Sequence, residues 1–117
     1  MIRLLATALA IGLAPTLSAT AEVHDTERLP IAVQTVTDGL VHPWGMAFLP
    51  DGAILVTERP GTMRIVSPSG VASAPIAGVP EVVSRGQGGL LDVTLHPDFA
   101  ANRLVYWSYA EAGEGGT

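Results

Sequence analysis

The stretch Trp44-Gly-Met-Ala-Phe-Leu-Pro-Asp-Gly52, followed by Ile54-Leu-Val-Thr57, decides the fold because the same pattern occurs again. The second copy is Leu91-Asp-Val-Thr-Leu-His-Pro-Asp-Phe99, followed by Leu104-Val-Tyr-Trp-Ser108. Each copy is an apolar strand, a Pro-Asp turn and a returning apolar strand. Pro97 follows Pro50 by 47 residues, within the roughly 40 to 50 residues typical of blade-like β repeats.

The turn residues predict an all-β protein. Turn signals such as Asp38-Gly39 and Pro60-Gly61 recur at the ~8- to 12-residue spacing of all-β architectures, and no stretch after residue 32 has helical periodicity. The predicted strands are 33–37, 44–49, 54–58, 63–67, 90–95 and 103–109, with a weak outer strand within 71–83.

The length of the repeat region predicts an incomplete domain. A repeat unit of this kind buries its apolar faces only against neighbours, and a closed propeller needs at least four blades of four strands each, roughly 160 residues. Residues 32–117 make fewer than two periods. We therefore expect 32–117 to be the first part of a β-propeller domain, truncated after less than two four-stranded antiparallel blades.

The N-terminus has the pattern of a secretory signal. Arg3 precedes a mostly apolar run over 4–17, and Ala19-Thr-Ala21 suits signal peptidase. The alternative, a membrane anchor, is disfavoured because the run falls short of the ~20 apolar residues of a membrane span and Pro15 interrupts it. We expect a signal peptide at 1–21, an N-terminal arm at 22–31, and a periplasmic or secreted protein with no membrane attachment after cleavage.

Composition excludes several functions. The chain has a net charge of −5 and no cluster of basic residues, so it lacks the electrostatic footprint of a nucleic-acid-binding protein. The same charge disfavours an anionic membrane surface. With no cysteine in the chain, disulfides and thiol catalysis are excluded.

Several motifs, in order, resemble one enzyme family. His42-Pro-Trp-Gly-Met-Ala-Phe-Leu-Pro-Asp-Gly52 and Leu55-Val-Thr-Glu-Arg-Pro-Gly61 are similar to the opening of the soluble quinoprotein sugar dehydrogenases, the glucose/sorbosone or aldose sugar dehydrogenases. Gly78-Val-Pro80, Gly86-Gln-Gly-Gly-Leu-Leu-Asp-Val93 and His96-Pro-Asp-Phe99 continue the resemblance. It covers roughly residues 32–110.

The resemblance implies a six-bladed propeller that holds pyrroloquinoline quinone (PQQ) and calcium at its central opening. Such enzymes oxidise the anomeric carbon, C1, of aldoses to lactones, with a histidine accepting the hydroxyl proton while hydride passes to the quinone. In the family that histidine, and the groups that grip quinone and calcium, lie downstream of Thr117. We therefore expect no catalytic, cofactor or metal ligand within these residues, and no activity of the 117-residue chain by itself.

Gln87 is the one site residue that the resemblance places in this chain. In the family, the glutamine of the Gly-Gln-x-Gly loop hydrogen-bonds the sugar in the central cleft. The flanking Gly86 and Gly88 allow a tight turn and leave space beside an amide that both donates and accepts. The alternative is a turn glutamine exposed to solvent.

Other polar and aromatic residues favour structural roles. His42 and His96 each precede proline, and His24 lies in the arm, so none is expected to be a catalytic base. Asp51 and Asp98 are expected to cap their own turns and not to bind calcium, whereas Asp92 has no clear structural role. Glu58 and Arg59 suggest an exposed ion pair worth at most ~1 kcal/mol. For the aromatic residues, packing is favoured over sugar stacking: Trp44, Phe48, Tyr106 and Trp107.

Two other functions remain open from the sequence. One is a non-catalytic propeller that binds another protein, and the other is a lactonase-like, metal-dependent propeller hydrolase. The preferred sugar, the electron acceptor and the oligomeric state are not determined by these residues.

Overall fold

The computed structural model describes residues 21–116, which fall into two compact units, 21–34 and 35–116. The predicted signal peptide therefore lies outside the described residues, except for Ala21. In the first unit, β1 (Glu22–His24) pairs antiparallel with β2 (Ile31–Val33). The prediction of a strand at 33–37 is wrong, because β2 ends at Val33, which pairs with the first residue of β1, Glu22. No helix in the described residues is both long and apolar enough to cross a membrane.

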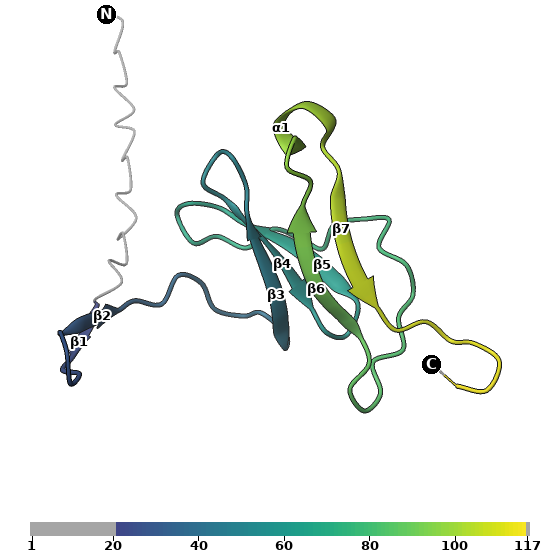
Figure 1. The fold of residues 1–117 in the computed structure, drawn as a ribbon, viewed down its shortest axis with the longest axis horizontal. Helices are drawn as coiled ribbons and strands as arrows, with labels where there is room; N and C mark the ends of the chain where they lie inside the picture. Colours follow the sequence, from purple (N-terminus) through teal and green to yellow (C-terminus); the bar gives the residue numbers. More distant parts are fainter. Residues whose placement is uncertain (1–20, 117) are drawn as a thin grey trace, which may run out of the picture. The chain divides into compact units, whose positions relative to one another are not determined.

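The second unit begins with a three-stranded antiparallel sheet in the order β3-β4-β5 (Figure 1). Its strands are β3 (Pro43–Phe48), β4 (Ile54–Glu58) and β5 (Thr62–Val66). The Pro-Asp turn joins β3 to β4, with Leu49 N donating to the Ala53 carbonyl at 2.8 Å. These strands confirm the sequence prediction to within about a residue, because alternating apolar residues and turn dipeptides are both local signals.

The predicted weak outer strand is an irregular segment beside β5. Ala72 bridges to Val66, Ser73 N donates to the Ile65 carbonyl at 2.8 Å, and Ile76 N donates to Met63 at 2.8 Å. Pro75 lies between these bonds and cannot donate one. The first blade-like unit thus has three regular strands and one interrupted segment, in place of four regular strands.

The second copy of the repeat forms a separate antiparallel pair, β6 (Leu90–Leu95) and β7 (Val105–Tyr109). Between them lies α1 (Phe99–Asn102), a single helical turn that was not predicted from the sequence. Ala101 N and Asn102 N both donate to the Asp98 carbonyl, and Arg103 ends the turn in the left-handed conformation, at φ 58°. The second Pro-Asp turn is thus longer than the first.

The core lies where the two sheets pack face to face. β6 lies against β3 and β4 (Figure 1). The buried cluster takes Leu55 from β4, Met63 from β5, and Leu90 and Val93 from β6. Both first strands of the repeat carry an irregularity at matching places, between Pro43 and Met46 in β3 and between Leu90 and Val93 in β6.

Candidate functional site

Gln87 lies at the tip of a tight loop that leads into β6. Gly88 N donates to the Arg85 carbonyl at 2.9 Å and closes a turn around Gly86 and Gln87. Gly86 has a φ of 58°, a conformation that glycine adopts without steric cost. The Gln87 side chain is exposed, so its amide is free to meet a ligand at this edge. The sugar contact of Gln87 itself stays a prediction.

Two further glycines hold this loop close to the rest of the chain. A Cβ on Gly88 would lie 2.6 Å from the Val83 carbonyl oxygen, and a Cβ on Gly89 would lie 2.4 Å from the Arg59 carbonyl oxygen. Gly89 also has a φ of 145°. The glycines after Gln87 are therefore required by close packing as well as by turn geometry.

Arg59 fastens the loop from the end of β4. Its Nη1 atom donates to the carbonyl oxygens of Gly86 at 2.8 Å and Gly88 at 3.3 Å. Its own carbonyl accepts from Leu90 N at 2.9 Å. This role of Arg59 could not be predicted from the sequence, because the only local signal was a charged residue at the end of a strand.

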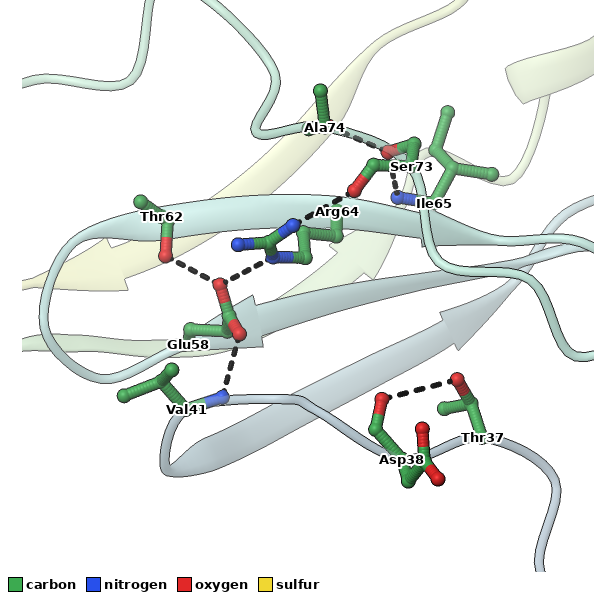
Figure 2. Close-up of polar contacts among 9 residues, drawn as sticks. All are labelled: Thr37, Asp38, Val41, Glu58, Thr62, Arg64, Ile65, Ser73 and Ala74. Carbon is green, nitrogen blue, oxygen red and sulfur yellow. Dashed lines mark hydrogen bonds and ion pairs between the residues drawn. The ribbon is translucent and has the colours of Figure 1, made fainter.

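Glu58 is fully buried and pairs with Arg64, not with Arg59, so the predicted exposed ion pair is wrong. Figure 2 shows that its carboxylate accepts from Val41 N at 2.6 Å, Thr62 Oγ1 at 2.5 Å and Arg64 Nε at 2.9 Å. Burial by itself would raise the pKa of Glu58. The hydrogen bonds from Thr62 and Val41, together with the hydrogen bond and charge of Arg64, outweigh burial and leave that pKa below its usual value.

Arg64 extends this cluster to the outer segment. Its Nη1 donates to the Ser73 carbonyl at 2.8 Å (Figure 2). Through Glu58 and Arg64, the segment before β3, the β4–β5 hairpin and the outer segment are joined by side chains. This arrangement points to a structural cluster, since two of the donors to the carboxylate lie on β5 and the third, Val41 N, lies in the segment before β3.

His96 and His42 lie beside turns, whereas His24 lies on a strand. His96 Nδ1 accepts from Asp98 N at 2.9 Å and lies 2.8 Å from Asn102 Nδ2, which supports its predicted structural role. The carbonyl of His42 accepts from Arg59 N at 3.0 Å, and His42 has a φ of 48°. His24 lies on β1, with Nε2 3.8 Å from a Glu22 oxygen.

The aspartates differ from one another. Asp51 Oδ1 accepts from Ala53 N at 3.1 Å, which confirms the predicted cap of the first turn. Asp98 makes no side-chain capping bond, so that prediction is wrong; its carbonyl holds α1 instead. Asp92 Oδ1 accepts from Val93 N at 2.9 Å at the irregularity of β6. Within residues 21–116, no three histidine, aspartate or glutamate side chains are grouped as metal ligands would be.

The four aromatic residues for which packing was favoured over sugar stacking are partly exposed in this chain. Trp44 is 53% exposed and Phe48 67% exposed, and both line an apolar groove with Met46, Ile54 and Val56. This groove is on the face of the sheet that does not carry the core cluster. Tyr106 and Trp107 on β7 are also more than one third exposed.

Comparison with known proteins gives consistent matches. The family described as Glucose / Sorbosone dehydrogenase matches residues 40–117. The aldose sugar dehydrogenase YliI of Escherichia coli is 48% identical over 87 residues, covering 74% of this chain and 24% of that protein.

Solved structures agree. A crystal structure of a glucose dehydrogenase is 59% identical with a TM-score of 0.64, covering 68% of this chain and 23% of that one. The PQQ-bound aldose sugar dehydrogenase of Streptomyces coelicolor is 35% identical with a TM-score of 0.65, covering 85% and 27%. The chain spans about a quarter of the length of these relatives. Because the family match covers well over half of the chain, the protein belongs to the glucose/sorbosone dehydrogenase family.

Proposed function

We propose that this chain is the N-terminal part of a quinoprotein that oxidises aldose sugars at C1 to lactones, with PQQ as hydride acceptor. The observation that carries this proposal is the family match over residues 40–117. By the full-length protein we mean a chain as long as its relatives. We propose that this chain folds as a six-bladed propeller of four-stranded blades.

The exposed apolar face of the first sheet supports the propeller architecture. One face of β3 and β4 packs against β6, while the other carries the groove lined by Trp44, Met46 and Phe48. A sheet that is apolar on both faces requires cover on both, as a blade between two neighbours has. A single additional sheet on the groove would supply this cover.

The described residues do not fit the cofactor or a calcium ion. Their acidic and histidine side chains form no ligand group, and none of their buried side-chain polar atoms lacks a partner. We therefore assign no step through PQQ or calcium to these residues. Both groups are proposed to bind elsewhere in the full-length protein, where the quinone supplies the hydride acceptor.

Gln87 is proposed to bind the sugar. Its exposed amide projects from a loop whose backbone is fixed on both sides of it. An amide donates to one sugar hydroxyl and accepts from another, so a fixed amide orients the sugar as well as binding it. The proton-accepting histidine is proposed to lie outside these residues.

Export completes the proposal. A signal peptide at 1–21 would place the mature protein in the periplasm or outside the cell. N-terminal sequencing of the protein recovered from the periplasm or the medium tests this directly. A first residue of Glu22 supports it, whereas a retained Met1 contradicts it.

The activity is tested with the full-length protein, a panel of aldoses and a redox dye, with and without added PQQ and calcium. Dye reduction that requires both an aldose and PQQ is the expected result. The 117-residue chain assayed in parallel is expected to be inactive. Absence of quinone-dependent oxidation of every aldose would refute the dehydrogenase, and hydrolysis of lactones by the same protein would favour the lactonase alternative.

A further inference from the structure

We infer that Arg59 is the positioning residue of the sugar site: it fixes the loop that carries Gln87, and affinity for the sugar depends on it. This inference rests on the proposed sugar contact of Gln87. It adds a residue that is distant from Gln87 in sequence and acts through the backbone on both sides of Gln87.

The geometry of the contact is specific to the position of Gln87. A single nitrogen of Arg59, Nη1, reaches the carbonyls of Gly86 and Gly88, which immediately precede and follow Gln87. The Gly86 carbonyl lies in the peptide plane just before Gln87, and the Gly88 carbonyl lies in the plane one residue further on, so Arg59 holds both ends of the Gln87–Gly88 segment. The plane between Gln87 and Gly88 is held by Gly88 N, which donates to the Arg85 carbonyl at 2.9 Å. Two flanking glycines would otherwise leave this backbone with wide conformational freedom. The Cα–Cβ direction of Gln87 is thus constrained by a guanidinium from the turn that follows β4.

Arg59 also anchors the start of β6 through its main chain. Leu90 N donates to the Arg59 carbonyl at 2.9 Å, and Gly89 lies so close that a Cβ would come within 2.5 Å of Arg59 Cγ. The loop is therefore held at its tip by the side chain and at its base by the backbone of one residue. Only the side-chain part is removed by substitution.

The anchor itself is firmly placed. Arg59 directly follows β4, and its N donates to the His42 carbonyl at 3.0 Å. The preceding residue, Glu58, is fully buried and holds the neighbouring Val41 N. A site residue keeps its geometry when the residues behind it are fixed in this way. Arg59 therefore connects the exposed loop to a well-packed position at the end of β4.

The chemistry requires arginine. A guanidinium presents several N–H donors in a planar fork and keeps its charge at any working pH, and bonds from a charged donor are stronger than neutral ones. A lysine at this position would provide a single mobile ammonium, which reaches one carbonyl more easily than two. We therefore expect Arg59→Lys to restore only part of the function.

The experiment compares R59A, R59K, Q87A and R59A/Q87A in the full-length, PQQ-loaded protein, with D-glucose and other aldoses as substrates. R103A is the matched control, since it removes one positive charge beside α1, at the end of β6 remote from the loop. We expect Q87A to raise KM about 3- to 10-fold, the loss of one hydrogen bond. R59A should raise KM by a similar factor, R59K by less, and R103A should leave KM unchanged.

The double variant separates positioning from a general loss of structure. If Arg59 acts through Gln87, R59A/Q87A has the KM of Q87A alone, because coupled residues are not additive. Amide hydrogen exchange adds a readout without sugar: R59A should accelerate exchange in the peptide spanning 85–90 and leave the peptide of β4 unchanged. Additive effects on KM, or equally faster exchange in β4, would overturn the inference.

The wild-type protein distinguishes the two proposals. If it oxidises no aldose, the proposed function fails and the sugar role of Arg59 fails with it. If it is active but R59A retains the KM of R103A, only the positioning role is overturned.

Discussion

The buried hydroxyl of Thr57 joins the two sheets: it donates to the Leu91 carbonyl on β6 at 2.6 Å and accepts from Gly45 N on β3 at 2.9 Å. Thr57 is fully buried. It lies on β4 opposite the irregular part of β3, where regular strand pairing is interrupted. One side-chain hydroxyl thus takes the place of backbone bonds at the point where the two copies of the repeat meet.

Replacing Thr57 with valine should lower the free energy of unfolding by about 1–3 kcal/mol, because the partly buried Gly45 N loses its side-chain acceptor. Urea denaturation of the full-length protein measures this loss. Thr57→Ser keeps the hydroxyl and should lose clearly less stability than T57V. Equal losses in the two variants would mean that the methyl group, and not the hydrogen bonds, supplies the stability.

Gly45 is expected to tolerate no side chain. A Cβ there would lie 3.0 Å from both Cα and Oδ1 of Asp92, and 3.1 Å from Val93 N. Two of these three neighbours are backbone atoms, so Gly45→Ala should separate β3 from β6 and destabilise the protein by about 1–3 kcal/mol. A midpoint of thermal unfolding that is lower for G45A than for the wild type would measure this loss of stability.

Gly113→Ala provides the control for this substitution. Gly113 also has an ordinary backbone conformation, and the nearest atom to its added Cβ is 3.5 Å away, an ordinary contact. The midpoint of thermal unfolding of G113A should match that of the wild type. A G45A protein as stable as G113A would show that the two sheets do not approach as closely as described.

The strands of the repeat could be predicted from the sequence because their signals are local. Alternating apolar residues and the turn residues Pro50, Asp51 and Gly52 act within a few positions of one another, and the structure agrees to about a residue. The structure of the second Pro-Asp turn was harder to predict from the sequence. Phe99 replaces the glycine of the first copy, and the chain forms a helical turn that only the left-handed Arg103 ends.

The roles of Glu58 and Arg59 could not be predicted because their partners are distant. Val41 is 17 positions from Glu58, and Gly86 is 27 positions from Arg59. A charged pair at the end of a strand is typically exposed, and only the packing of other segments decides which member is buried. The loop that carries Gln87 could be recognised from its own residues. Arg59, which holds this loop, could be identified only from the structure.

The Glu58 cluster predicts a dependence of stability on pH. Because the pKa of Glu58 is below its usual value of 4.5, ionised Glu58 stabilises the fold above that value, and this stabilisation is lost as pH falls through the lowered pKa. Glu58→Gln leaves Arg64 without its carboxylate. At neutral pH the variant should be less stable than the wild type by about 3 kcal/mol.

The difference between wild type and E58Q should shrink as pH falls below about 4.5, because the wild-type carboxylate becomes protonated as well. Urea midpoints measured from pH 7 to pH 3 follow this convergence. Asp38→Asn, which alters an exposed carboxylate, serves as the control. A difference between wild type and E58Q that stays constant over this range would contradict a charged Glu58.

The groove on the first sheet predicts opposite effects of one substitution in two contexts. Phe48 is 67% exposed in this chain and lies in the groove with Trp44 and Met46. Contiguous exposed apolar surface favours association, so the 117-residue chain should self-associate with rising concentration, and Phe48→Lys should reduce this association.

In the full-length propeller a neighbouring blade would cover Phe48, and a buried lysine there should lower the midpoint of thermal unfolding. Light scattering of the chain and thermal unfolding of the full-length protein test the two halves. A full-length F48K protein with an unchanged midpoint would mean that no neighbouring sheet covers this face.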